Sequence, residues 1–181
     1  MNNKNTPITL EYPEAVANTR VCGAEGKPLL VYHGTRSIFT IFELSDKPLA
    51  RGNLRGFYFT SNLEAAMEYG PHIMMAYIDL KNPFIGNAFD HFTQVHGITK
   101  PGFGSSPEVF EKYKAVTPTA VKAFLIAEGY DGVIVPANTG YMDHDEIVAF
   151  ESNQIHLISP APQVEKAVKP TRKASIPSFG M

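Results

Sequence analysis

The sequence predicts an α+β domain built mainly from short antiparallel strands, with a few helices between them. Short apolar or aromatic runs, which are typical of strands, occur at residues 29–32, 57–59, 73–80, 131–135, 146–150 and 155–158. The clearest helix signals follow residues 61 and 117. Because strands and helices do not alternate regularly, as they would in a parallel α/β sheet, we expect mainly antiparallel sheets.

The first helix signal combines a start and a stop. Ser61 and Glu64 have the spacing of a capping box, in which the Ser61 hydroxyl accepts from a helical amide and Glu64 bonds back to Ser61. Gly70 and Pro71 then end the helical pattern. We therefore expect a short helix of about two turns between these signals.

The second helix signal lies between Thr117 and Gly129. Pro118 suits the first helical position, and Gly129 suits the position just after the last turn. Residues 12–19 are also compatible with a short helix. Residues 34–55 and 85–108 are rich in Gly, Pro or polar side chains, and we interpret both stretches as loops.

Composition limits the class of protein. The chain has 181 residues, of which 44% are hydrophobic, enough for one domain with a sizeable core. Its formal net charge of −2 excludes a protein held on nucleic acid by bulk positive charge, although a local basic patch stays possible. The single cysteine, Cys22, excludes an internal disulfide, and we expect it to be a buried or half-buried thiol.

The pattern of prolines and charges suggests three regions. Residues 1–27 are polar and interrupted by Pro and Gly, residues 28–159 hold the predicted domain, and residues 160–181 form a flexible basic tail. No apolar signal segment and no stretch of roughly 20 apolar residues is present. We expect a cytoplasmic, monomeric protein that does not associate with membranes, and delivery into a host cell stays open.

Several common catalytic signatures are missing from the sequence. It contains no G-x-G-x-x-G dinucleotide fingerprint, no phosphate-binding G-x-x-x-x-G-K-[ST] loop, no H-E-x-x-H and no G-x-S-x-G. No two of the six histidines are four residues apart, and His91 and His96 are five apart in a predicted loop. We therefore expect no metal site.

Four short segments carry side chains suited to chemistry. His33 and Gly34 end a predicted strand, where the glycine lets a ligand approach the backbone closely. Tyr58 and Tyr69 flank the first helix, so their rings can face one slot and clamp a flat, especially a cationic, ligand. The alternative for each segment is structural: a histidine in a turn, and two tyrosines in the core.

The fourth segment is His144, Asp145 and Glu146, at the start of an apolar strand. Alternate residues of a strand share a face, so His144 and Glu146 point together while Asp145 points away. A carboxylate beside a buried strand is costly unless it is paired or used. The alternative is a strand that begins in solvent.

In order and spacing, these segments resemble the ADP-ribosyltransferase superfamily, in its His-Tyr-Glu branch with diphtheria toxin and the poly(ADP-ribose) polymerases. Within that branch they are similar to the small ADP-ribosyltransferase domains in polyvalent proteins of phages and plasmids. The similar stretches are Tyr-His-Gly-Thr at 32–35, Gly-Phe-Tyr-Phe-Thr at 56–60, Lys-Asn-Pro at 81–83, Gly-Tyr-Asp-Gly-Val-Ile at 129–134, and Glu146 with Asn-Gln-Ile at 153–155. The likeness covers residues 28–158, and it implies two packed, mostly antiparallel sheets with NAD⁺ in the cleft between them.

The resemblance also implies roles for the candidate residues. His33 would hydrogen-bond the adenosine ribose, and the Gly34 backbone would hold the nicotinamide carboxamide. Tyr58 and Tyr69 would stack on the nicotinamide ring. Glu146 would hydrogen-bond the 2′-hydroxyl of the nicotinamide ribose, where its charge would stabilise an oxocarbenium-like transition state.

Further residues join the predicted site. Thr35, Ser61 and Ala66 fall in the expected NAD⁺-binding set, although Ala66 stands where the polymerases have a serine that bonds nicotinamide. His144 and Arg55 are expected on the acceptor side. Arginine-modifying relatives have a second glutamate at the position of His144, so the resemblance disfavours arginine as acceptor.

The implied activity is mono-ADP-ribosylation of a protein or nucleic acid, with NAD⁺ as substrate and no metal. Three alternatives stay open: NAD⁺ hydrolysis, RNA 2′-phosphotransfer, and a degenerate domain that only binds NAD⁺ or a partner. A phosphotransferase would need an arginine cluster, for which Arg36, Arg51 and Arg55 are the available residues. We also hypothesise that residues 36–55 and 90–114 frame the acceptor site, because long loops in compact domains are often functional.

Overall fold

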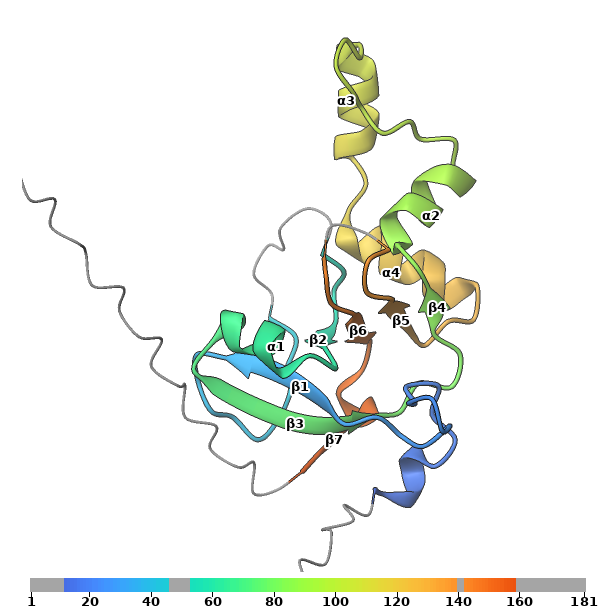
Figure 1. Cartoon of the computed structure of the whole chain (residues 1–181). Helices are drawn as coiled ribbons and strands as arrows, with labels where there is room; N and C mark the ends of the chain where they lie inside the picture. Colours follow the sequence, from blue (N-terminus) through green and yellow to red (C-terminus); the bar gives the residue numbers. More distant parts are fainter. Residues whose placement is uncertain (1–11, 46–52, 140–141, 159–181) are drawn as a thin grey trace, which may run out of the picture.

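The computed structural model describes residues 12–45, 53–139 and 142–158, and in these ranges the strands form two sheets (Figure 1). The first sheet has the order β1-β3-β7, with strands β1 (Val31–Thr35), β3 (His72–Ile78) and β7 (Ile155–Leu157). The second has the order β2-β6-β5-β4, with strands β2 (Phe57–Phe59), β6 (Glu146–Ala149), β5 (Gly132–Val135) and β4 (Phe84–Ile85). The pairs are antiparallel except for β4 with β5, so the α+β prediction is confirmed.

The two sheets are joined beside β1 and β2. The Tyr32 amide donates to the Thr60 carbonyl at 2.8 Å, and the Thr60 amide donates back to the Tyr32 carbonyl at 3.0 Å. In the first sheet His33 pairs with Met74, and in the second Tyr58 pairs with Val148. The bridge therefore sets His33 of one sheet next to Tyr58 of the other.

Helix α1 (Leu63–Tyr69) lies against β1 and ends at Gly70, as predicted. Its start differs from the prediction, because the N-cap is Asn62, whose side chain accepts from the Ala65 amide at 3.1 Å. The Ser61 amide instead donates to the Asp145 carboxylate, which comes from a distant part of the chain. That tertiary bond explains why the capping box at Ser61 does not form.

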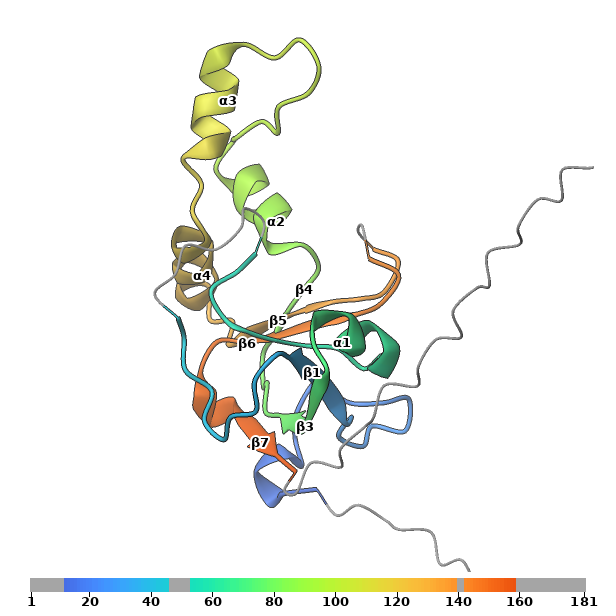
Figure 2. The same cartoon turned by 90° about the vertical axis from the view of Figure 1, so that its left-hand side faces the viewer.

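The predicted loop over 85–108 is wrong, because it contains helix α2 (Ala88–Val95) and the start of helix α3 (Pro107–Lys114). Asn87 caps α2 by accepting from the Asp90 amide at 3.0 Å, and Pro107 takes the first turn of α3. Helix α3 has no fully buried side chain, although Val109 and Tyr113, one turn apart, are half-buried. Figures 1 and 2 show α2 and α3 extending away from the two sheets as an arm, with α3 outermost.

The second predicted helix is confirmed as α4 (Pro118–Ala127). The Thr117 side chain accepts from the Ala120 amide at 3.1 Å, and Gly129 adopts a φ of +87° after the last turn. That left-handed conformation suits glycine, which has no Cβ to clash. Within the described residues no helix has the length and apolar character needed to cross a bilayer.

Two clusters of buried apolar side chains hold the fold together. One is centred on the first sheet and includes Val31, Ala76 and Ile78, and the other lies under α2 and α4 and includes Leu125 and Phe150. Burial of such side chains is the main favourable term in folding. The clusters fix β1, β2 and β6, on which the candidate site residues stand.

Residues 12–22 pack on this core. The Thr19 hydroxyl donates to the Ile78 carbonyl at 2.6 Å and accepts from the Leu80 amide at 3.1 Å, and Val16 is fully buried. The predicted helix over 12–19 shrinks to one 3₁₀ turn, η1 (Glu14–Val16), because Thr19 bonds to the sheet rather than continuing a helix. Cys22 is exposed, contrary to the expected buried thiol, since it lies at an isolated bridge with Pro28.

Candidate active site

His33 stands in the middle of β1, which runs on to Thr35 instead of ending at the histidine. Its Nδ1 lies 2.8 Å from the Tyr58 carbonyl oxygen. A carbonyl can only accept, so Nδ1 carries the proton and Nε2 keeps a lone pair. Burial lowers the pKa of His33, against the smaller raising effect of this hydrogen bond. The imidazole is therefore a neutral acceptor near pH 7.

Aromatic neighbours fix the orientation of His33. The rings of Phe39, Phe42 and Phe59 lie with their centroids 6.0, 5.2 and 5.6 Å from the imidazole. Phe42 and Phe59 are buried. Such edge and tilted contacts restrict the ring, so the direction of the Nε2 lone pair is preset by the fold.

Tyr58 is the central residue of β2 and is partly buried. Its hydroxyl donates to the Leu54 carbonyl at 2.9 Å. Burial, and secondarily the nearby Glu146 carboxylate, raise the pKa of Tyr58. Tyr58 is a neutral phenol at pH 7. Strand β2 holds one end of its side chain, and the hydrogen bond to Leu54 holds the other.

Tyr69 is the last residue of α1 and is 55% exposed, so its ring is not part of the core. Burial of its hydroxyl raises the pKa of Tyr69, and Glu146 and Glu68 add to the effect. Tyr58, Tyr69 and Glu146 all line one cavity.

Glu146 begins β6, opposite Val135 of β5. Burial raises the pKa of its carboxyl, and His144 partly offsets the rise. Asp145 faces the other way, as the strand pattern predicts, and accepts from the Thr60 hydroxyl at 2.8 Å and the Ser61 amide at 2.9 Å. Glu146 is therefore free of the hydrogen bonds that anchor Asp145, and it faces a cavity.

That cavity, here called the first cavity, has a volume of about 340 Å³. It brings together most of the predicted residues: His33, Gly34, Tyr58, Ala66, Tyr69, His144 and Glu146. It also includes residues that the sequence analysis did not select: Tyr32, Asn53, Gly56, Phe59, Thr60 and Met142. Tyr32 and Thr60 adjoin predicted site residues in the chain, whereas no local pattern marked Asn53 or Met142.

Three predicted residues do not line the first cavity. The Arg55 guanidinium donates from Nη1 to the Ser45 carbonyl at 2.9 Å. The Thr35 hydroxyl donates to the Ser37 carbonyl at 3.0 Å, and Ser61 is held through its amide by Asp145. The structure thus places Arg55, Thr35 and Ser61 in supporting loop and turn contacts.

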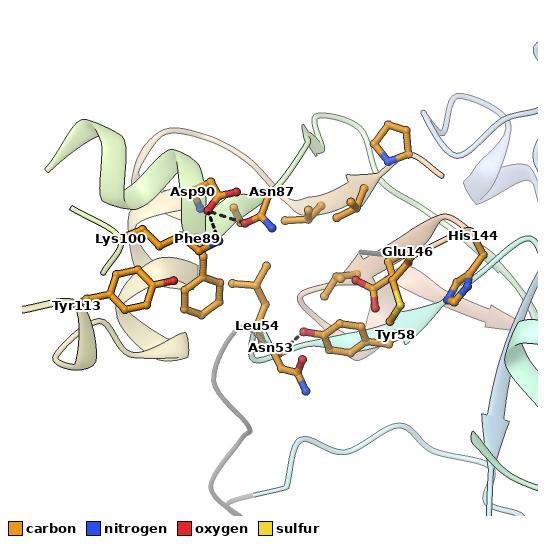
Figure 3. A pocket seen from close by; sticks show the side chains of 16 residues that line it. Asn53, Leu54, Tyr58, Asn87, Phe89, Asp90, Lys100, Tyr113, His144 and Glu146 are labelled. Carbon is orange, nitrogen blue, oxygen red and sulfur yellow. Dashed lines mark hydrogen bonds and ion pairs between the residues drawn. The ribbon is translucent and has the colours of Figure 1, made fainter. Parts of the chain in front are cut away.

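Two further cavities adjoin the first. A second cavity of about 310 Å³ shares Asn53, Tyr58, Met142, His144 and Glu146 with it. Figure 3 shows this second cavity, with Tyr58, Glu146 and His144 at one end and Lys100 and Tyr113 at the other. A third cavity of about 280 Å³ shares His33, Gly56 and Tyr58 with the first.

Gly34 is required by packing as well as by its place in the cavity. A Cβ added at Gly34 would lie 1.7 Å from the carbonyl oxygen of Ala66 in α1. The absence of a side chain lets the helix lie directly on the strand. Gly34 and Ala66 thereby form the floor of the first cavity from two closely packed elements.

Comparison with known proteins identifies the family. The model of a family described as ADP-ribosyltransferase in polyvalent proteins matches residues 23–161. The chain belongs to this family. The family match and the two mainly antiparallel sheets confirm the ADP-ribosyltransferase fold predicted from the sequence. The family uses NAD⁺ as substrate, together with an acceptor of ADP-ribose.

Other comparisons add little to the family match. No curated protein matches the chain. A solved structure described as a crystal structure of an anti-CRISPR protein is similar at 12% sequence identity and a TM-score of 0.38, covering 72% of this chain and 95% of that chain. Among the described residues, no group of three His, Cys, Asp or Glu side chains gathers to hold a metal.

Proposed function

We propose that the protein cleaves NAD⁺ at the bond between nicotinamide and ribose, and transfers a single ADP-ribose to a macromolecular acceptor. One observation carries the proposal: His33, Tyr58, Tyr69 and Glu146 line the same 340 Å³ cavity in a chain of the ADP-ribosyltransferase family. A domain that only bound NAD⁺ would have no evident need for a half-buried carboxylate, Glu146, beside the reacting ribose. The combination favours catalysis over a domain that only binds.

The nicotinamide end of NAD⁺ fits the part of the first cavity between Tyr58 and Tyr69. Both phenols are neutral at pH 7, since the ordinary tyrosine pKa of 10.0 is raised further here, and their rings can lie against the flat, positively charged ring. The Gly34 backbone and Ala66 lie beside them. Ala66 offers no side-chain hydrogen bond, so the carboxamide would bond to backbone groups.

The adenosine end fits the third cavity. Its apolar and aromatic lining includes Phe39, Ile41 and Phe42, which suit an adenine ring. His33 and Tyr58 connect this cavity with the first. The Nε2 lone pair of His33 would accept from a ribose hydroxyl, and its neutral state at pH 7 is the one that can do so.

Glu146 supplies the main electrostatic aid to bond cleavage. Nicotinamide leaves with the electron pair of the broken bond and becomes a neutral ring. The ribose that remains is positively charged and oxocarbenium-like. Glu146 is half-buried, so its carboxylate is poorly solvated and its pKa is raised. Positive charge that develops beside it relieves this cost, so the interaction is stronger in the transition state than in the ground state.

The test compares the wild-type protein with Glu146→Gln in a bacterial lysate supplied with NAD⁺ labelled in its adenylate phosphate. Products are separated into protein, nucleic acid and free ADP-ribose. We expect macromolecular label with the wild type and its loss with the variant. Label only in free ADP-ribose would indicate a hydrolase, and no consumption of NAD⁺ by the wild type would refute catalysis.

RNA 2′-phosphotransfer, which needs an arginine cluster, has no support from the site. Arg55 bonds to the Ser45 carbonyl and, like Arg36, does not line any of the three cavities. Arg51 lies outside the described residues. The described part of the site therefore provides no arginine for a substrate phosphate.

A further inference from the structure

We propose that the second cavity receives the acceptor, that the acceptor is a side chain of another protein, and that His144 takes the proton which the acceptor loses. The proposal rests on the proposed function, because it assigns the second substrate of the same reaction. Its three supports are the position of the second cavity, the hydrogen bonding of His144, and the distribution of charge around the site.

The second cavity offers a space beside Glu146 that is separate from the one assigned to nicotinamide. An acceptor has to approach the ribose C1′ from the face opposite the departing nicotinamide. With nicotinamide between Tyr58 and Tyr69, the acceptor therefore needs a separate space that also reaches Glu146. The second cavity meets this condition, because Tyr58, Glu146 and His144 line both cavities while Tyr69 lines only the first (Figure 3).

His144 has the hydrogen bonding of a general base. It is only 8% exposed, and its Nδ1 lies 3.0 Å from a carboxylate oxygen of Asp143. A carboxylate accepts, so Nδ1 donates the proton and Nε2 keeps its lone pair. The Asp143 side chain is 94% exposed, so this bond orients the imidazole more than it compensates a buried charge.

The transfer step balances with His144 as the base. The bond between C1′ and the nicotinamide nitrogen breaks, and its electron pair goes to nicotinamide. A lone pair of the acceptor atom forms the new bond to C1′, and the acceptor proton goes to Nε2 of His144. The Glu146 carboxylate lines both cavities together with His144, so a negative charge stands in the space where the proton is transferred. The proton is later released to water.

The charges around the site favour a protein over a nucleic acid. Every lysine in the described ranges lies within 4.0 Å of a carboxylate oxygen: Lys27, Lys81, Lys100, Lys112, Lys114 and Lys122. The described arginines, Arg20, Arg36 and Arg55, line none of the three cavities. In the second cavity the carboxylates of Asp90 and Glu146 accompany the single cation Lys100. Nucleic acids bind mainly through contacts of Lys and Arg with phosphate. The cavity instead suits a neutral side chain with a dissociable proton.

The arm formed by α2 and α3 provides a surface for such a protein. Tyr113 of α3 and Phe89 of α2 line the second cavity, so the arm borders its opening. Phe103, between the two helices, is fully exposed, and Phe110 is 41% exposed. Aromatic side chains of this kind are enriched where proteins bind one another. A folded acceptor could contact the arm and present one side chain to the cavity.

The first test separates acceptor binding from NAD⁺ binding. Tyr113→Ala alters the second cavity only, and Lys112→Ala is the matched control, because Lys112 is the adjacent exposed residue of α3 and lines none of the cavities. With full-length protein and labelled NAD⁺, we expect Tyr113→Ala to lower protein labelling about tenfold. Its dissociation constant for NAD⁺ should match that of Lys112→Ala.

The second test addresses the proton. We expect His144→Ala to lower protein labelling by about a hundredfold, within the usual range for loss of a general base. Added imidazole should restore part of the activity, because it can enter the space left by the side chain. Imidazole should have no effect on Glu146→Gln, whose defect is electrostatic. A merely structural role for His144 would give no such rescue.

The outcomes distinguish the inference from the proposed function. Label found in nucleic acid or only in free ADP-ribose, yet lost in Glu146→Gln, would overturn the acceptor assignment and leave NAD⁺ cleavage intact. Equal losses of labelling and NAD⁺ binding in Tyr113→Ala would overturn the role of the second cavity. Absence of imidazole rescue would overturn the role of His144. Absence of NAD⁺ consumption by the wild type would instead refute the proposed function.

Discussion

The sheets and the arm differ in what holds them. Strands β1, β2 and β6 pack through buried residues such as Val31, Phe59 and Ile147, whereas α3 has no fully buried side chain. The residues proposed to bind and cleave NAD⁺ stand on the sheets and on α1, and the arm borders only the second cavity. The two sheets and α1, here called the body, hold the residues proposed for the chemistry, while the arm borders the proposed acceptor cavity. Within the arm only α3 can change at little cost in stability, because Ala88 and Phe89 of α2 belong to a buried cluster.

The largest expected effect tests the body through Glu146→Gln. Replacing the carboxylate by a neutral amide of the same shape removes the charge that stabilises the ribosyl cation. We expect the rate of NAD⁺ cleavage to fall by about 10²–10³, comparable with removal of one electrostatic contact in other enzymes. The measurement is single-turnover release of nicotinamide, with Glu64→Gln on the exposed face of α1 as control.

The same substitution should raise stability at neutral pH. The folded-state pKa of Glu146 lies above its ordinary value because burial disfavours the charged form. The folded state therefore binds the proton more tightly than the unfolded state, and stability falls as pH rises through this interval. Urea unfolding at pH 7.5 should show Glu146→Gln to be more stable than the wild type. A less stable variant would mean that Glu146 has a structural role.

The next largest effect tests the packing of the body. Gly34→Ala would place a Cβ 1.7 Å from the Ala66 carbonyl, so α1 has to move away from β1. We expect a loss of about 1–3 kcal/mol in the free energy of unfolding, the usual cost of overpacking. NAD⁺ binding should weaken as well, because α1 carries Tyr69. A matched change at exposed Gly102, where an added Cβ meets nothing within 4 Å, should leave both unchanged.

A smaller effect concerns His33 and acid. Burial holds the folded-state pKa of His33 below its ordinary value of 6.5. As pH falls below that value, the unfolded chain takes up the proton first, so stability is lost between the ordinary pKa and the lower folded pKa. Unfolding by urea at pH 7.5 and 5.5 should show this loss in the wild type and a smaller loss in His33→Gln. Equal losses of stability between pH 7.5 and 5.5 in the two proteins would mean that the imidazole is solvated in the folded protein.

The body and the arm also differ in how far the sequence predicted them. The strand at 57–59 and the helix from Pro118 have strong local signals, an aromatic run and a Thr-Pro start, and the structure confirms both. The arm does carry start signals, Asn87 before α2 and Ser106-Pro107 before α3, but they lie in a polar, glycine-containing stretch that favours a loop. No side chain of α3 is fully buried, so no buried apolar run supports those signals.

Within the site, the sequence predicted residues but not their tertiary contacts. His33, Tyr58 and Glu146 could be selected because their segments, taken together and in order, resemble the ADP-ribosyltransferase family, whereas each segment alone also fits a structural role. The N-cap at Asn62 could not, because the choice against Ser61 depends on Asp145, 84 positions away. Asn53 and Met142 enter the first cavity only through the meeting of two segments distant in sequence.

The smallest expected change in stability comes from Phe103→Ser in the arm. The Phe103 side chain is fully exposed and buries no surface, so the free energy of unfolding should change by no more than about 0.5 kcal/mol, as for other surface substitutions. Protein labelling should nevertheless fall, because an exposed aromatic residue contributes to binding of a protein acceptor. Ile126→Ser on the exposed face of α4 is the control, since it removes a comparable exposed side chain away from the cavities.

If Phe103→Ser destabilises the protein by more than 1 kcal/mol, roughly a fivefold change in the folding equilibrium, the arm is structurally coupled to the body. If it labels acceptors as well as the wild type does, acceptor choice lies in the second cavity alone, and the arm contributes only through Tyr113 and Phe89.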